Sequence, residues 1–228
     1  MNEKENRASL MEAFVIKSVV KQKVYENTRQ SFVILKKVLR QLEKDYLQVV
    51  EDKVPAAVLP EFKDRGPFEA EMKLGGDMLI FSMHSNVFEF DDKHPLWKTQ
   101  YVKDDPLRAY CGVIRIYNFL ADSFKYNRVN DIGYLVARIF INKENHFFVE
   151  GKRQTMEAVK DFSKDTISPG VVREIIEVAI QYCIEFDLLV PPYDQVKMAT
   201  VDQINEKMVL SKMTTGKRIG FSFNSDDI

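Results

Sequence analysis

The sequence predicts an α+β protein in which helices cover an antiparallel sheet of about five or six strands. Three observations support this fold class. No glycine or proline occurs between Ser9 and Val54, so the chain opens with a long N-terminal amphipathic helix or helical hairpin. From residue 68 onward, segments of alternating character are joined by short turns. The tripeptide Ser168-Pro169-Gly170 then opens an apolar helical run, with Ser as N-cap and Pro at the first position.

The composition is typical of a folded chain with long elements. Apolar residues make up 45% of the 228 residues and phenylalanine occurs 16 times, which is enough to offset the ordering entropy of a large core. Only nine glycines and eight prolines interrupt the chain, which favours long helices and strands. The 33 basic and 34 acidic residues leave a formal charge of −1, without the basic excess of a dedicated double-stranded DNA binder.

Three features predict a cytoplasmic protein that makes no membrane contact. Cys111 and Cys183 each lie inside an apolar run, which is typical of buried free thiols in a reducing compartment. The first twelve residues carry no apolar signal-peptide core. The longest candidate for a membrane span, residues 171–190, is interrupted by five charged residues.

The N-terminal segment contains the most regular pattern of the chain. Ser9 and Glu12 have capping-box spacing and predict the start of a helix, which Pro55 and Pro60 stop. Seven side chains then step alternately by four and three residues, as in a three-repeat heptad seam. They are Thr28, Phe32, Leu35, Leu39, Leu42, Tyr46 and Val49. A broader apolar stripe precedes them, made of Leu10, Phe14, Val15, Val19, Val20 and Val24.

Two arrangements of this segment remain open. A single rod would pair with a second copy as a coiled coil through residues 28–50, whereas a bend near residues 26–28 would make a hairpin that covers the sheet. We expect a homodimer in either case. The chain then divides into a helical segment at 1–54, a linker at 55–67, an α+β domain at 68–223 and an acidic tail at 224–228.

The α+β domain is expected to begin with a meander and to continue with a hairpin. Strands are predicted at 68–74, 78–83 and 87–90, then at 133–141 and 146–152 around a polar turn, and finally at 218–223. The stretch 107–124 fits a buried helix loosely, but its β-branched residues favour a strand at 110–119. Helices are predicted at 157–162, 169–187 and 200–210.

A weak catalytic motif stands at the end of the predicted hairpin. Glu150-Gly151-Lys152 has the E-x-K form of metal-dependent nucleases, in which the carboxylate binds Mg²⁺ and the lysine stabilises charge beside the attacked phosphate. A second acid must stand nearby. If the turn centres on residues 143–144, Glu150 faces Ala137 and Asp131 lies roughly 20 Å further along. Asp77 or Asp91 could complete the site only if their strands neighbour the hairpin.

The three histidines do not form a recognisable ligand set. His84, Asp91 and His94 are a weak alternative for a mixed metal site, but no pair has the spacing that places two ligands on one element. His146 sits near a predicted turn. We therefore expect surface histidines, no metal and no cofactor.

Aromatic and basic residues are interleaved between residues 117 and 153. On a sheet face, such a mixture can stack bases or hold an anionic small molecule or single-stranded nucleic acid, although aromatic residues also favour strands and fill cores. The candidate binding residues are Tyr134, Arg138, Phe140, Phe148, Lys152 and Arg153.

No stretch of the sequence names a reaction. The preferred hypothesis is a non-enzymatic binding or regulatory module that self-associates or binds a partner through its N-terminal helix. The alternative is a metal-dependent phosphodiesterase or nuclease-like enzyme that uses Glu150 and Lys152. The two differ in what Glu150 must contact, because only the enzyme needs a second carboxylate within about 5 Å of it.

Overall fold

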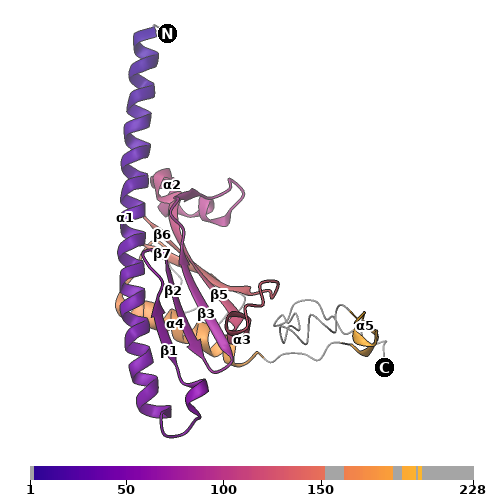
Figure 1. Cartoon of the computed structure of the whole chain (residues 1–228). Coiled ribbons are helices and arrows are strands. Elements are labelled where there is room, and N and C mark those ends of the chain that lie inside the picture. Colours follow the sequence, from indigo (N-terminus) through magenta and orange to yellow (C-terminus); the bar gives the residue numbers. More distant parts are fainter. Residues whose placement is uncertain (1–2, 152–161, 187–191, 199, 202–228) are drawn as a thin grey trace.

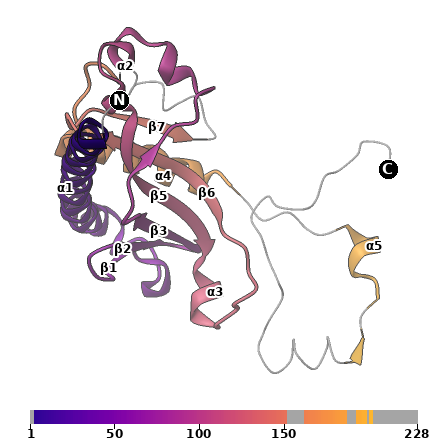
Figure 2. The same cartoon turned by 90° about the horizontal axis from the view of Figure 1, so that it is seen from above.

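One long helix runs along one face of a curved antiparallel sheet and continues well past it at the N-terminal end (Figures 1 and 2). A shorter helix crosses the same face, so the expected α+β fold is confirmed. The structure is a computed structural model that describes residues 3–151, 162–186, 192–198 and 200–201. The sequence predictions for 157–161, for 202–210 and for everything from 218 onward lie outside these residues.

The N-terminal segment forms a single helix, α1 (Glu3–Val50), of 48 residues. At 1.5 Å per residue it is about 72 Å long. It is therefore a rod and not a hairpin. The prediction that Ser9 caps the helix is wrong, because the helix already runs through Ser9 from Glu3; the polar residues before Ser9 include no glycine or proline to stop it.

Within the described residues, the sheet has seven strands in the order β1-β2-β3-β5-β6-β7, with β4 paired to β5. All of its pairings are antiparallel. The strands are β1 (Glu61–Asp64), β2 (Glu69–Leu74), β3 (Asp77–Met83), β4 (Phe88–Glu89), β5 (Tyr110–Leu120), β6 (Tyr134–Asn142) and β7 (Phe147–Gly151).

Helices and short turns connect and cover these strands. The α-helices after α1 are α2 (Gln100–Asp104), α3 (Ala121–Lys125), α4 (Pro169–Ile184) and α5 (Tyr193–Val196), and the 3₁₀ turns are η1 (Ala56–Val58), η2 (Pro95–Lys98) and η3 (Pro106–Ala109). Ser168 caps α4 as predicted, since its hydroxyl accepts from the Val171 amide. Among the described residues, no helix combines the length and apolarity needed to cross a bilayer.

Several sequence predictions are sharpened by the strand pairing. The favoured strand at 110–119 is confirmed as β5. The predicted third strand of a meander is β4, but it pairs with β5 instead of β3. Residues 61–64, which we took as part of a linker, form the edge strand β1. Gly75, with φ of +57°, makes the tight turn between β2 and β3.

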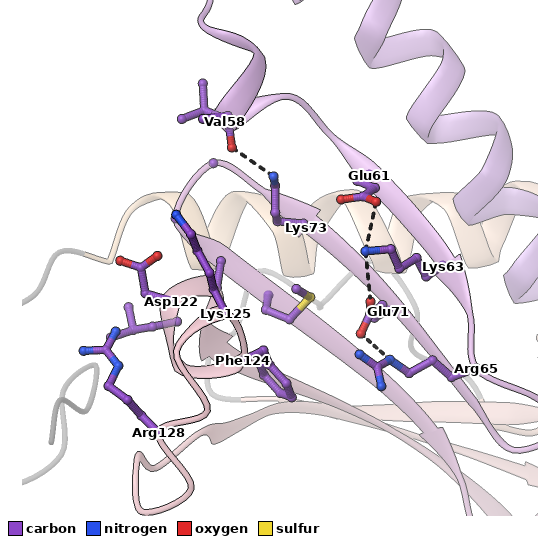
Figure 3. A pocket seen from close by; sticks show the side chains of 16 residues that line it. Val58, Glu61, Lys63, Arg65, Glu71, Lys73, Asp122, Phe124, Lys125 and Arg128 are labelled. Carbon is purple, nitrogen blue, oxygen red and sulfur yellow. Dashed lines mark hydrogen bonds and ion pairs between the residues drawn. The ribbon is translucent and has the colours of Figure 1, made fainter. Parts of the chain in front are cut away.

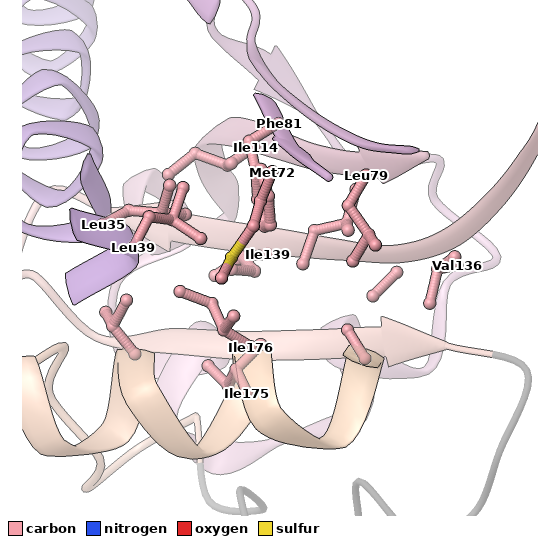
Figure 4. Packing of buried hydrophobic residues seen from close by; sticks show 14 of the residues in the cluster. Leu35, Leu39, Met72, Leu79, Phe81, Ile114, Val136, Ile139, Ile175 and Ile176 are labelled. Atoms are coloured by element: carbon pink, nitrogen blue, oxygen red, sulfur yellow. The ribbon is translucent and has the colours of Figure 1, made fainter. Parts of the chain in front are cut away.

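The main core lies between the sheet and the two helices α1 and α4 (Figure 4). Strand alternation explains which side chains enter it, because successive residues of a strand point to opposite faces. Met72, Leu79 and Ile114 point from the sheet towards Leu39 of α1 and Ile176 of α4. Each of these five side chains is fully or almost fully buried.

The heptad seam of α1 faces this core. Thr28, Phe32, Leu35, Leu39 and Leu42 are all buried within the chain. A second copy therefore has no access to these five residues in this structure, and the sheet and α4 already cover the expected coiled-coil seam from Thr28 to Leu42, whereas Val49 at its end is 58% exposed. A period of 3.5 residues indicates an apolar face but not what covers it.

The opposite face of the sheet is only partly covered. The segment from η2 to η3 packs over β5, β6 and β7 and forms a second, smaller apolar cluster. This cluster contains Leu96, Val102, Ala109, Cys111, Val113, Phe140 and Phe162. The part of the face that belongs to β1, β2 and β3 lies beyond this segment and is bordered by α3.

Candidate functional site

The N-terminal extension of α1, residues 7–23, projects beyond the sheet (Figure 1). Packing against the body begins at Val24, which is fully buried, whereas almost every described side chain before it is exposed. Six large apolar side chains of the extension are between 44 and 69% exposed. They are Leu10, Met11, Phe14, Val15, Ile16 and Val19.

Five of these six side chains lie on about half of the helix circumference, since each residue advances the helix by about 100°. Basic residues border them. Arg7 lies two turns before Phe14 on the same side, and Lys21 lies three turns after Leu10 on the same side. The extension holds four basic residues and one acidic residue. It is therefore an apolar surface mixed with positive charge.

A second surface feature is a cleft of about 870 Å³ on the open part of the sheet (Figure 3). One wall comes from β1 and β2, and the other from α3 and the residues that follow it. Met78 of β3 lies in its lining. Two exposed apolar side chains, Val58 and Phe124, stand at its border.

The wall formed by β1 and β2 carries a row of alternating charges (Figure 3). Lys63 Nζ lies 2.9 Å from Glu61 Oε1 and 4.0 Å from Glu71 Oε1, and Arg65 contacts the other oxygen of Glu71. Glu71 is only 2% exposed, because these two cations lie over it. A buried carboxylate is tolerated when it is paired in this way.

Two lysines of the cleft are not neutralised by this row. Lys73 Nζ donates to the carbonyl oxygen of Ala57 at 2.9 Å. Lys125 lies 5.0 Å from the centre of the Tyr126 ring, and its contact with the Tyr126 hydroxyl raises the pKa of Lys125. Neither ammonium group has a carboxylate within 4.0 Å among the residues that the structure describes.

The aromatic residues predicted to bind a ligand are divided between the two faces of the sheet. Arg138, Phe140 and Phe148 share the partly covered face, where the Phe140 and Phe148 rings stack at 4.8 Å and Arg138 lies over Phe140. Tyr134 lies in the main core instead, because a register shift beside Ile116 changes the facing of β6. Lys152 and Arg153 lie outside the described residues.

These stacked rings are used for packing. Phe90 joins them with ring centres 5.0 Å from Phe140 and 5.4 Å from Phe148, and Phe162 meets Phe148 edge-on at 5.2 Å. Phe140 itself is buried. The cluster therefore presents no free ring face of Phe140 on which a base could stack.

Glu150, the candidate metal ligand, is paired with cationic or neutral partners. It contacts Arg138, and its Oε1 lies 3.7 Å from Nε2 of His94. The strand register places it opposite Arg138 and not opposite Ala137, one residue away from our expectation. Within the described part of the chain, no group of three His, Cys, Asp or Glu side chains is placed to hold a metal ion.

The loop residues of the weak metal alternative hold turns together. His84 Nδ1 accepts from the Asn86 amide at 2.9 Å, and His94 Nδ1 accepts from the Leu96 amide at 3.3 Å. Asp91 accepts from the Lys93 amide at 2.9 Å. Each side chain thus satisfies a backbone donor two residues further along, as turn residues commonly do.

Sequence reasoning missed the cleft because it took residues 55–67 as a linker. A signal was present in the alternation of β1 and β2, where Glu61, Lys63, Glu71 and Lys73 occupy every second position. In the register of the structure, Glu61 faces Lys73 and Lys63 faces Glu71.

Comparison with known protein families, curated proteins and solved structures finds no match to this chain.

Proposed function

We propose that this chain is a non-enzymatic binding module that associates with a second copy of itself through the N-terminal extension of α1. One observation carries the proposal: six large apolar side chains within ten residues are about half exposed on a helix that projects from the body. Isolated apolar residues on a surface are ordinary, but a contiguous group of this size is typical of an interaction surface.

Helix stability supports a partner for the extension. A helical segment of this length is marginal in water by itself, and most helical stability in proteins comes from packing an apolar face. Residues 24–46 have that packing against the sheet and α4, whereas no described apolar side chain of the extension before Val24 is fully buried, and Lys21 reaches the body only as a cation 5.8 Å from the centre of the Tyr110 ring. A second extension lying alongside supplies the missing apolar contact.

The positive charges on two extensions repel each other and so oppose self-association, but this repulsion is weak. Two exposed unit charges about 10 Å apart in water repel by roughly 0.4 kcal/mol, and salt at physiological strength screens this further. Burying one half-exposed large side chain contributes about 1 kcal/mol. The six apolar residues on each copy therefore outweigh the few pairs of cations. Lysine and arginine stems also lie readily along a helix interface with their charges in water.

Sedimentation equilibrium of the full chain between about 1 and 100 µM tests the proposal. The wild-type mass should rise towards that of a dimer, and added salt should leave the association unchanged or strengthen it. Leu10→Glu with Phe14→Glu should keep the chain monomeric across this range, because two charges then lie inside the contact.

A matched control comes from the same helix. Val33 is 44% exposed on the solvent side of the packed part of α1. Val33→Glu adds the same charge to the same helix and should leave the dimer intact. A wild-type chain that remains a monomer at every concentration would contradict the proposal, as would a Val33→Glu variant that loses association to the same extent.

A further inference from the structure

We propose that the cleft between β1–β3 and α3 binds a small organic anion, with its phosphate or carboxylate group between Lys73 and Lys125 and its apolar part against Phe124. The inference does not depend on self-association, because none of the cleft residues belongs to α1. It assigns a ligand to a part of the sheet's second face that the segment from η2 to η3 does not cover.

The size and shape of the cleft suit a small molecule. Ligand pockets commonly enclose about 300–1,000 Å³, and this cleft measures about 870 Å³. The edge strand β1 and its neighbour β2, which β3 supports from the other side, form one wall, and α3, which follows β5 directly, forms the other. Side chains on such elements hold a ligand with little loss of loop entropy.

The balance of charges in the cleft lining favours a ligand with negative charge. Five cations and three carboxylates line the cleft. Lys63 and Arg65 are matched by Glu61 and Glu71, so the row on the β1–β2 wall is close to neutral. The fifth cation, Arg128, lies 3.3 Å from a carboxylate oxygen of Asp131. Lys73 and Lys125 then contribute two positive charges from opposite walls, which the exposed side chain of Asp122 offsets only in part. An anion between the two ammonium groups satisfies both of them.

The apolar lining indicates an organic ligand and not a bare ion. Phe124 and Val58 are 42 and 40% exposed at the border of the cleft, and Met78 lies in the lining between the walls. A ring or short chain placed on Phe124 would remove this surface from water. A strand of nucleic acid needs several stacking platforms along a groove, and Phe124 is the single aromatic residue in this lining.

Methyl groups of methionine allow a direct test by NMR on the full chain. Met78 lines the cleft, whereas Met72 of the neighbouring strand is fully buried on the other face of the sheet and acts as an internal control. Adenosine triphosphate should shift the Met78 signal in a saturable way and leave Met72 unchanged. Citrate tests a carboxylate without a ring, and adenosine tests a ring without charge.

Either anion can support the proposal. A response to the nucleotide assigns the charged group as phosphate, and a response to citrate alone assigns it as carboxylate. If adenosine shifts the Met78 signal as much as adenosine triphosphate does, the proposal of an anion site is overturned, because the charge of the ligand would then not contribute to binding. A response to a ten-residue oligothymidylate with none to the small anions would also overturn it, in favour of nucleic acid.

Paired variants separate a built site from general attraction between charges. Lys73→Gln with Lys125→Gln should raise the dissociation constant by about tenfold or more, since each lysine makes a charge-assisted contact. Lys37→Gln with Lys44→Gln removes the same charge from exposed positions on α1 and should leave binding unchanged. An equal loss in both pairs, or no Met78 shift at about 10 mM of either anion, would refute the site.

Discussion

A close contact between α1 and the sheet depends on one glycine. A Cβ atom added at Gly112 of β5 would lie 2.1 Å from Oγ1 and 2.8 Å from Cβ of Thr28. Thr28 is itself fixed, because its hydroxyl donates to the Val24 carbonyl at 2.7 Å. Nearby, the side-chain amide of Asn27 donates to the carbonyl oxygens of Asn142 and Lys143, both at 3.0 Å. These contacts locate the helix against the sheet.

We therefore expect Gly112→Ala to destabilise the protein by about 3 kcal/mol, because overpacking a close contact forces the helix or the strand to move. Urea unfolding followed by circular dichroism measures this change. Gly76→Ala is the control, since no heavy atom lies within 4 Å of the position its Cβ would take. Equal midpoints for the two variants would show that α1 does not approach β5 so closely.

A second residue contact links α1 to α4 and depends on pH. Arg173 lies 2.6 Å from Asp45, and together with a hydrogen bond from Gln41 it holds the pKa of the Asp45 carboxyl below its ordinary value of 3.8. A carboxyl group with a lowered folded pKa stabilises the fold above its unfolded pKa, and this contribution disappears as the pH falls through the folded pKa.

Asp45→Asn should accordingly lower the melting temperature slightly at pH 7 and low salt, and the difference from the wild type should shrink as the pH falls through the folded pKa, which lies below 3.8. The effect is small because the pair is partly exposed and screened by solvent. Melting curves between about pH 2.5 and 7 measure it. A difference that stays constant over this range would show that the Asp45 carboxylate has no ionic role.

Some residue-level features were readable from the sequence and others were not. The Ser168 cap is found where expected, and the turn at Gly75 follows likewise from local chemistry, because glycine adopts a positive φ without steric cost. The predicted cross-strand partner of Glu150 was Ala137, whereas the structure pairs Glu150 with Arg138. The prediction was wrong by one residue because the hairpin register depends on the turn at Asn145, whose φ is +66°. The facing of Tyr134 depends on an irregularity in β5–β6 pairing that no local pattern reveals.

At the level of elements, α1 combines two parts with different surroundings. The seam from Thr28 to Leu42 was visible as a 3.5-residue pattern, and its apolar character was correctly read. The same pattern fits a second helix or a sheet equally well, so the sequence could not tell that β5, β6 and α4 cover it. The broader stripe that precedes it would have covered the sheet in the hairpin arrangement, but α1 is a single helix, so only Val24 of this stripe is buried and its residues 10–19 lie outside the body.

These two parts should respond differently to substitution. Leu35→Ala removes a fully buried side chain and should cost about 3 kcal/mol of unfolding free energy, while leaving the dimer dissociation constant unchanged at temperatures where the chain stays folded. Phe14→Ala removes a side chain that is 63% exposed and should weaken dimerisation with little change in the stability of the monomer.

Urea unfolding of dilute protein and sedimentation equilibrium of concentrated protein measure the two effects separately. Val33→Ala is the control for both, because Val33 belongs to neither surface. A Leu35→Ala chain that dissociates without losing monomer stability would restore the original coiled-coil hypothesis for residues 28–50 and would exclude the packing described for α1.

For the molecule as a whole, the fold class was predictable and the open surface was not. An antiparallel sheet covered by helices follows from alternation and from the apolar run of α4, because these patterns report burial directly. The cleft arises where an edge strand, a β-turn and α3 meet, and these segments are separated by about sixty residues in sequence. Only the pairing of β3 with β5 brings them together.

Hydrogen exchange over the whole chain connects the fold with the proposed function. Amides exchange according to the free energy of local opening, which is small where a helix lacks tertiary contacts. At low concentration, residues 7–20 should therefore exchange much faster than residues 24–46 of the same helix. Raising the concentration into the dimer range should slow exchange in residues 7–20 and leave the packed half unchanged.

Leu10→Glu with Phe14→Glu should abolish this concentration dependence. Mass spectrometry of peptides from both halves measures it, and exchange at residues 7–20 that stays the same at every concentration would mean that the extension of α1 meets no second copy.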